Sequence, residues 1–193
     1  MEIKYKNTTI RITPGVYEPC EDSFLLADAA LAEIKDTDCV LEVGCGSGII
    51  SAVINANTKA SIIGIDISPD AVKCTKENGI EVIRGDLLNC LKGKFNVIVF
   101  NPPYLPTREF EKEEGWMNAA LDGGHDGRQV IYRFLANAEN YLANNGKILM
   151  LVSSVTGIEE IKSRMSSLDF SVKELSGERF MFEQLKIIVA TKL

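Results

Sequence analysis

The stretch that most constrains the fold is an apolar strand that runs directly into a glycine-rich turn, Val40-Leu41-Glu42-Val43-Gly44-Cys45-Gly46-Ser47-Gly48. A helical pattern from Ile49 to Asn57 follows at once. Glycines in such a turn let the backbone approach a bound nucleoside closely, at the carboxyl end of a buried strand. The order of strand, turn and helix therefore predicts an open α/β sheet with a nucleoside site at the ends of its strands.

The glycine-rich turn lacks the residues that bind a pyrophosphate. A dinucleotide fingerprint would place a glycine where this chain has Ile49, and a phosphate-binding P-loop would need a Gly-Lys-Ser/Thr sequence. Glu42, at the start of the turn, would repel phosphates but suits an ammonium or a sulfonium cation. S-adenosylmethionine carries both cations, so we expect it as the ligand. The turn residues expected around it are Gly44, Cys45, Gly46 and Gly48.

Two more acidic residues follow the next two expected strands. The strand Ser61 to Ile65 ends in Asp66, where a carboxylate accepts the ribose hydroxyls in doubly wound nucleoside sites. The strand Ile80 to Arg84 leads to Asp86, which could accept a hydrogen bond from the adenine amine. Each acid alone is more often a solvated strand-end carboxylate or a helix cap, but their joint order indicates a cofactor site. We include the neighbouring Ile67 and Leu87 in it.

A fourth expected strand, Val97 to Phe100, ends in Asn101-Pro102-Pro103-Tyr104. The asparagine offers a side-chain carbonyl and Pro102 offers a backbone carbonyl, on a backbone that two X-Pro bonds hold extended. Two such acceptors suit a planar NH₂ group, and Tyr104 would add a flat face beside it. Asn-Pro-Pro is also ordinary turn chemistry. The nucleoside-site residues upstream favour the interpretation as a clamp for an amide or exocyclic amine that becomes methylated.

Taken in order, the motifs EVGCGSG, GIDIS, GDLL and NPPY resemble a class I S-adenosylmethionine-dependent methyltransferase of the HemK type. These enzymes are protein-glutamine methyltransferases that act on peptide chain release factors. The segment Val16 to Leu26 resembles the V-Y-x-P-x-E-D-[ST]-x-L-L signature of the archaeal and eukaryotic branch. Asp122 to Gly127 resembles the D-G-G-x-D-G element found after NPPY. A short segment before the first helix, in place of a helical domain, also favours the short branch.

The resemblance implies a Rossmann-like α/β fold with a seven-stranded, mostly parallel sheet, an antiparallel last strand and helices on both faces. It implies methylation of the N5 amide of the glutamine in a GGQ motif, with S-adenosyl-L-homocysteine as product and no metal. The residues expected to be catalytic are Asn101, Pro102 and Tyr104, and these three together with Pro103 are expected to bind the methyl acceptor. Glu21, Asp22 and Asn101 are expected to contact the cofactor. A small zinc-binding activator subunit is expected on the edge strand at Ile80 to Arg84.

The length of 193 residues and the hydrophobic content of 46% predict a single domain over 1–193. We divide it into an N-terminal extension and first helix in 1–35 and the catalytic core in 36–193. Helices are expected over 18–34, 69–78, 128–144 and about 157–168, and strands over 147–152, 171–175 and 185–191. Ser176-Gly177-Glu178-Arg179 is expected to be the turn between the last two strands. The long segment Leu105 to Gly127 is expected to be a movable cover over the acceptor pocket. The acidic Glu109, Glu111, Glu113 and Glu114 and the single Trp116 suggest this cover, although a charged stretch is also typical of a solvated face.

Charge and composition weigh against several other classes of protein. The 193 residues are 46% hydrophobic and carry a net charge of −6, without a basic run that would neutralise nucleic-acid phosphates. An adenine or guanine amine methyltransferase, a lysine or small-molecule methyltransferase, a dinucleotide-binding oxidoreductase and a noncatalytic binding module remain as alternatives.

The five cysteines are odd in number and lack Cys-x-x-Cys spacing, so we expect reduced, mostly buried thiols and neither a disulfide framework nor a zinc site. His125, the single histidine, is expected to be a loop residue. The chain shows no signal-peptide pattern and no membrane span, which predicts a cytoplasmic protein.

Overall fold

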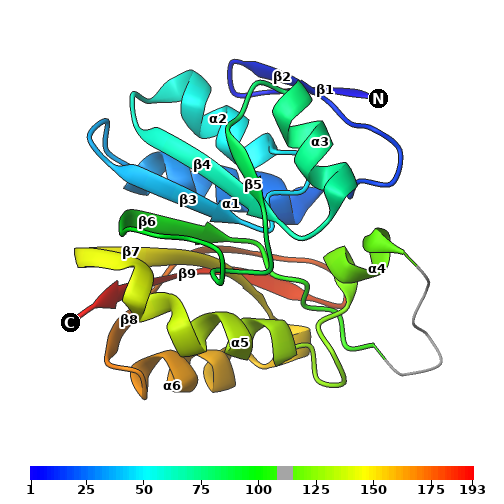
Figure 1. The fold of residues 1–193 in the computed structure, drawn as a ribbon. Coiled ribbons are helices and arrows are strands. Elements are labelled where there is room, and N and C mark those ends of the chain that lie inside the picture. Colours follow the sequence, from blue (N-terminus) through cyan, green and yellow to red (C-terminus); the bar gives the residue numbers. More distant parts are fainter. Residues whose placement is uncertain (108–114) are drawn as a thin grey trace.

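A sheet of seven strands runs through the described part of the molecule, which is residues 1–107 and 115–193 of a computed structural model (Figure 1). In spatial order the strands are β5 (Val82–Arg84), β4 (Ser61–Asp66), β3 (Cys39–Val43), β6 (Phe95–Phe100), β7 (Leu142–Ser153), β9 (Gln184–Lys192) and β8 (Phe170–Arg179). The pairs from β5 to β7 are parallel, and β9 is antiparallel to both of its neighbours. The expected mostly parallel sheet with an antiparallel last strand is confirmed.

Helices cover both faces of the sheet (Figure 1). They are α1 (Glu21–Glu33), α2 (Ile49–Asn57), α3 (Pro69–Glu77), α4 (Trp116–Leu121), α5 (Gln129–Ala138) and α6 (Ile158–Ser166), with 3₁₀ turns η2 (Glu139–Tyr141) and η3 (Ser154–Thr156). Alternate side chains of strand β7 pack in two hydrophobic cores, one on each face of the sheet. Leu149 and Leu151 pack in the core of α1 and α2, whereas Ile148, Met150 and Val152 pack in the core of α5 and α6.

The second core contains a close pair of aromatic rings. The rings of Phe100 on β6 and Phe134 on α5 have centroids 4.7 Å apart, and both side chains are fully buried. Burying one such side chain stabilises a fold by roughly 1.5–3 kcal/mol. Because Phe100 directly precedes Asn101, this packing fixes the end of β6 from which the acceptor motif continues.

Two helix boundaries differ from the expected ones for local reasons. Helix α1 begins at Glu21, not at residue 18, because Pro19 disfavours the helical conformation of the residue before it. Helix α5 ends at Ala138, and the chain enters β7 at Leu142 instead of remaining helical to residue 144. Leu142 pairs with Phe95 before a shift of register, so strand pairing in the assembled sheet overrides the local helical pattern.

The expected turn at Ser176-Gly177-Glu178-Arg179 is wrong. These residues belong to β8 and pair with β9, after a register shift between Glu174 and Ser176, and the chain turns at 180–183 instead. A Cβ on Gly177 would lie 2.7 Å from the Leu185 carbonyl oxygen. The glycine therefore serves a close approach of two strands, which in sequence is indistinguishable from a turn glycine.

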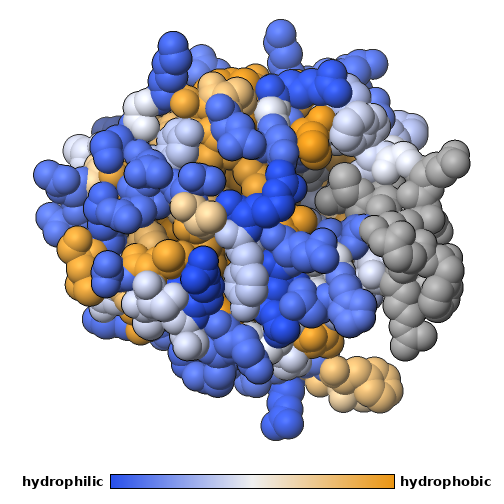
Figure 2. Space-filling view, turned by 60° about the horizontal axis from the view of Figure 1, so that its bottom comes forward, coloured by the Kyte–Doolittle hydropathy of each residue, from blue (hydrophilic) through white to orange (hydrophobic). Residues whose placement is uncertain are grey.

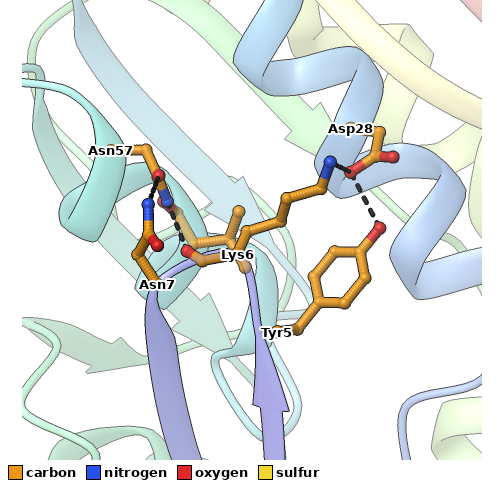
Figure 3. A network of polar contacts seen from close by, with 6 residues as sticks. Tyr5, Lys6, Asn7, Asp28 and Asn57 are labelled. Atoms are coloured by element: carbon orange, nitrogen blue, oxygen red, sulfur yellow. Dashed lines mark hydrogen bonds and ion pairs between the residues drawn. The ribbon is translucent and has the colours of Figure 1, made fainter.

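The N-terminal extension contains a hairpin that the sequence analysis missed, formed by β1 (Glu2–Tyr5) and β2 (Thr8–Arg11). Figure 3 shows its turn between two helices. Tyr5 Oη donates to Asp28 Oδ1 of α1 at 2.8 Å, with Lys6 Nζ 3.5 Å from the same oxygen. Asn7 Nδ2 donates to Asn57 Oδ1 of α2 at 2.8 Å. The hairpin thus ties α1 to α2.

Seen from the side of α5 and α6, the surface is mostly hydrophilic, with apolar side chains in separate patches (Figure 2). In the described part of the chain, no helix combines the length and the apolar character that a membrane span requires.

Two cysteines, Cys45 and Cys74, are buried, but Cys20 and Cys90 are exposed, so the expectation that most are buried is wrong.

Candidate active site

A cavity of about 490 Å³ opens at the carboxyl ends of β3, β4 and β6. The chain winds outward from β3 through β4 to β5 and then returns to the other side of β3 as β6. Ligands of open α/β sheets bind at such a switch in strand order. The sequence motifs meet here: a Cβ on Gly44, in the turn after β3, would lie 3.9 Å from the backbone oxygen of Asn101 after β6.

The glycine-rich turn is held in place by Asp66 at the end of β4. Asp66 Oδ2 accepts the Gly46 N–H at 2.9 Å, and Oδ1 accepts the Ser68 N–H at 2.8 Å. Gly46 has φ +55, a conformation that residues with a Cβ rarely adopt. Burial raises the pKa of Asp66, while these amide donors lower it. Asp66 therefore lines the cavity as an anchored carboxylate.

Gly48 has a packing role instead of a place in the cavity lining. It forms the left-handed N-cap of α2, and a Cβ there would lie 3.0 Å from the Thr75 methyl group. Cys45, which does line the cavity, approaches Thr75 Oγ1 at 3.5 Å. Both residues thus allow the glycine-rich turn to pack closely against Thr75 of α3.

Glu42 is a buried acid at the floor of the cavity, 2% exposed. Its Oε2 accepts the Ser51 N–H at 2.9 Å and also a hydrogen bond from the Ser51 hydroxyl. Burial raises the pKa of Glu42 to about 7, although the bonds from Ser51 lower it. A cationic group of a ligand beside this carboxylate would favour its ionised form.

The opposite end of the cavity is bounded by the segment after β5. Asp86 and Leu87 both line the cavity, and Leu87 has φ +52. Asp86 Oδ2 forms an ion pair with Arg133 of α5. Val130 and Arg133 also line the cavity, so α5 contributes to a site for which sequence reasoning named no residue of this helix.

Asn101 has the most unusual polar environment in the site. Its Nδ2 donates to Asp22 Oδ2 at 3.0 Å, across the gap between β6 and α1. A carboxylate only accepts hydrogen bonds, so this contact fixes the amide with its nitrogen toward Asp22. Within the described residues, Asn101 Oδ1 is the one buried side-chain nitrogen or oxygen atom that lacks a hydrogen-bond partner.

Asp22 is itself held rigidly at the start of α1. It is 5% exposed, and its Oδ1 accepts the Ser23 N–H at 2.6 Å and the Ser23 hydroxyl at 3.1 Å. Tyr17 Oη approaches Oδ2 at 3.3 Å. The structure thus places Asp22 in contact with Asn101, whereas Glu21 is exposed and lies outside the cavity lining.

Tyr104 and Tyr17 form an aromatic part of the cavity wall. Burial, followed by the charge of Asp22, raises the pKa of both phenols above the ordinary value of 10.0, so both stay neutral at physiological pH. The V-Y-x-P motif contained the signal for Tyr17, but sequence reasoning selected only the two acids that follow it.

The D-G-G-x-D-G element braces the backbone after NPPY. Leu105 O accepts the Gly123 N–H at 3.0 Å, and the Thr107 N–H donates to Gly124 O at 3.0 Å. A Cβ on Gly127 would lie 2.4 Å from the Tyr104 backbone oxygen, so only glycine permits this approach. His125 is exposed in this loop, as expected.

The segment 105–127, expected to be a cover, lies partly outside the described residues. Glu109, Glu111, Glu113 and Glu114 lie outside the described residues. Trp116 begins α4 and lines the cavity.

Among the described residues, no group of three or more His, Cys, Asp or Glu side chains is placed to hold a metal ion.

The fold and this cavity define a class I S-adenosylmethionine-dependent methyltransferase. The family model named Methyltransferase small domain matches residues 7–176. A candidate protein N5-glutamine methyltransferase of Methanocaldococcus jannaschii is 41% identical over the whole of both chains. Methyltransferase HEMK2 of Mus musculus is 37% identical over 79% of this chain and 78% of its own.

A solved structure agrees with these relatives. A chain of the E. cuniculi Mtq2–Trm112 complex, which is responsible for methylation of the eRF1 translation termination factor, superposes with a TM-score of 0.78. It is 26% identical and covers 93% of this chain and 99% of its own. The chain belongs to the methyltransferase small-domain family, and the resemblance to HemK-type enzymes is confirmed.

Proposed function

We propose that this protein transfers a methyl group from S-adenosylmethionine to the N5 amide nitrogen of the glutamine in the GGQ motif of a peptide chain release factor. The observation that carries this proposal is the environment of Asn101, whose oxygen is buried without a partner while its nitrogen is fixed by Asp22. An acceptor atom in that state is suited to an N–H donor from a ligand, because leaving it unpaired costs roughly 1–3 kcal/mol.

We assign each chemical group of the proposed cofactor to a residue that lines the cavity. Glu42 would face the cationic amino acid part, Asp66 the ribose and Asp86 the adenine amine, with the glycine-rich turn between them. The volume of about 490 Å³ lies within the range of small-molecule sites. When bound, S-adenosylmethionine supplies an electrophilic methyl carbon on its sulfonium.

The chain's own residues position the acceptor. An amide nitrogen is a poor nucleophile because its lone pair is delocalised. Asn101 Oδ1 and the Pro102 carbonyl would accept its two N–H groups, hold it in attack geometry and stabilise the positive charge that grows on it. Tyr104 would lie against the plane of the amide. No strong base is required before transfer, and the proton is released to water afterwards.

The names of the relatives support a glutamine acceptor. The Methanocaldococcus jannaschii protein is named for N5-glutamine, and the E. cuniculi complex is described as methylating a translation termination factor. Because release factors act at the ribosome, we place the reaction in the cytoplasm.

A transfer assay tests the acceptor directly. The protein is incubated with methyl-labelled S-adenosylmethionine and either the organism's release factor or its total RNA and DNA. We expect label in the release factor alone, mapped to the glutamine by peptide analysis and lost when that glutamine is replaced by alanine. Label in nucleic acid, or on another residue of the factor, would contradict the proposal.

We also propose that a small activator subunit, of the zinc-binding kind that the resemblance implies, adds to the edge of the sheet at β5. This strand is three residues long and, among the described residues, pairs with β4 alone, so its outer backbone groups can pair with another chain. Exposed apolar side chains lie on and beside it, namely Ile67, Ile83 and Trp116, and the Arg84 guanidinium lies 5.6 Å from the Trp116 ring.

Co-purification from the native organism tests this partner. We expect a small protein to be retained by the wild-type chain and lost from an Ile83→Glu variant. Full methyltransferase activity of the isolated chain would show that the enzyme does not depend on this subunit.

A further inference from the structure

The turn between β8 and β9 presents two large apolar side chains to solvent. Met181 is 87% exposed and Phe182 is 89% exposed, and Phe180 beside them is 37% exposed. We name residues 180–183 the hairpin tip. In Figure 1 the hairpin turns back on the side of the sheet where α4 lies, away from the C-terminus of the chain.

Folding does not account for these side chains. The hairpin closes where the Phe180 N–H donates to Glu183 O at 2.7 Å, so Met181 and Phe182 are the connecting residues. Such positions favour Gly, Asn, Asp, Ser or Pro. A methionine and a phenylalanine there bury almost none of their surface, and exposed apolar clusters on a protein commonly mark interaction sites.

The base of the hairpin tip is fixed to the end of β7. The Ser153 hydroxyl donates to Glu183 Oε1 at 2.5 Å, and the Gln184 N–H donates to Ser154 Oγ at 2.9 Å. The tip is therefore presented in a defined position. Because β7 is parallel to β6, its end lies at the same edge of the sheet as Asn101.

The same base is continuous with the acceptor wall of the cavity. The charge of Glu183 is one of the causes that raise the pKa of Tyr104, after burial and the charge of Asp22. Thr156, two residues beyond Ser154, and the Tyr104 backbone oxygen both lie close to the position that a Cβ on Gly127 would occupy. Val155, between Ser154 and Thr156 in sequence, is an exposed apolar side chain on this segment. The base of the tip and the backbone of the acceptor motif are thus joined through the segment 153–156.

A subunit on β5 would leave the tip free. Strands β5 and β8 are the two edges of the seven-stranded order. At about 4.8 Å per strand, they are separated by roughly 30 Å. The tip therefore lies on the opposite flank of the cavity from the proposed activator.

We propose that the hairpin tip docks an apolar patch of the substrate protein, next to the loop that bears the methylated glutamine. This inference rests on the proposed function. Aromatic and methionine side chains are enriched in protein interfaces, and a few of them carry most of the binding energy. Docking at the tip would hold the substrate loop over the acceptor clamp and give the enzyme affinity for the folded factor beyond the glutamine itself.

The test measures methylation of two acceptors by wild type, a double variant and a control variant. Met181→Ser and Phe182→Ser are combined, since serine is favoured in turns and the strands remain unchanged. The control is Leu175→Ser, which removes another exposed apolar side chain from the same hairpin, at its bulge. Each enzyme, with any small subunit that co-purifies, is assayed on the intact release factor and on a short peptide that contains its GGQ motif.

We expect the double variant to raise KM for the intact factor about tenfold or more, while its turnover of the peptide and its affinity for S-adenosylmethionine stay within twofold of wild type. Leu175→Ser should resemble wild type on both acceptors. A KM for the intact factor within twofold of wild type would overturn docking at the tip, as would a parallel loss on the peptide. Loss of the co-purifying subunit, or a changed oligomeric state by sedimentation, would also overturn it by assigning the tip another occupant. If wild type methylates neither acceptor, the proposed function fails and the docking inference fails with it.

Discussion

The wall of the cavity proposed to hold the cofactor, with Glu42 and Asp66, and the wall proposed to hold the acceptor, with Asn101 and Tyr104, satisfy their polar groups in opposite ways. On the first, the cofactor wall, the carboxylates of Asp66 and Glu42 already accept hydrogen bonds from backbone amides of their own chain. On the acceptor wall, Asn101 is fixed through its nitrogen but has a buried oxygen without a partner. The first wall is therefore formed before any ligand arrives. The second retains an unsatisfied acceptor, which fits a site that must engage a donor during the reaction.

The largest expected effect comes from removing that acceptor. Asn101→Ala should lower the catalytic rate by about two to three orders of magnitude, because one preorganised group is lost. Cofactor affinity should stay nearly intact. Single-turnover kinetics and calorimetry measure the two quantities, with the exposed Asn144→Ala as control. Unchanged turnover, or a ligand complex in which Oδ1 contacts only protein atoms, would contradict the clamp.

The cofactor wall should respond to pH through Glu42. Its pKa is raised from 4.5 to about 7, so the folded chain binds this proton more tightly than the unfolded chain does. The free energy of unfolding should therefore fall as pH rises from about 4.5 to about 7 and stay lower above that, by roughly 3 kcal/mol. Glu42→Gln should remove this part of the decline.

Urea unfolding between pH 5 and pH 8 checks this prediction. The exposed Glu77→Gln variant serves as the control and should follow wild type. If the stability of Glu42→Gln declines in parallel with that of wild type, Glu42 does not carry the raised pKa.

Asp66→Ala should weaken binding of S-adenosylmethionine by roughly 1.5–3 kcal/mol, since it removes both the proposed ribose acceptor and the anchor of the glycine-rich turn. Asp66→Asn keeps one acceptor oxygen, so its affinity for S-adenosylmethionine should fall between those of Asp66→Ala and wild type. Calorimetric titration gives the dissociation constants, with the exposed Asp70→Ala as reference. An unaltered constant would refute the assignment of Asp66.

Asp22→Asn should have the smallest effect and sharpens the contrast between the walls. The new amide can donate as well as accept, so Asn101 is no longer held in one orientation. We expect about a tenfold lower catalytic rate, comparable to one hydrogen bond, with cofactor affinity within twofold. The opposite result, intact turnover with weakened cofactor binding, would restore Asp22 to the cofactor site for which the sequence suggested it.

The strand-end motifs could be predicted because each is local. The residues at or directly after the carboxyl ends of β3, β4, β5 and β6 are Glu42 to Gly48, Asp66, Asp86 and Asn101, and most of them line one cavity. Parallel strands bring their carboxyl ends to one edge, so recognising the strands was enough to group these residues. Gly48 and Glu21 lie outside the lining because neighbours in sequence need not share a surface.

The contacts between distant segments could not be predicted in the same way. Asp22 and Asn101 are 79 residues apart, and Asp86 and Arg133 are 47 apart. No periodicity or motif spacing encodes such pairs. The turn of the last hairpin was misplaced for a related reason, since Gly177 is required by the opposing strand and not by a turn.

The sequence by itself determined the type and order of the strands and the chemistry at their tips, because hydrophobic period and turn residues act over a few positions. Only the tertiary structure decided the strand order, which brought the turn after β3 beside Asn101, and the orientation of the Asn101 amide. It also decided that Met181 and Phe182 remain exposed at the turn between β8 and β9. Burial and hydrogen-bond partners depend on every segment that packs around a residue, and these become defined only when the whole sheet has formed.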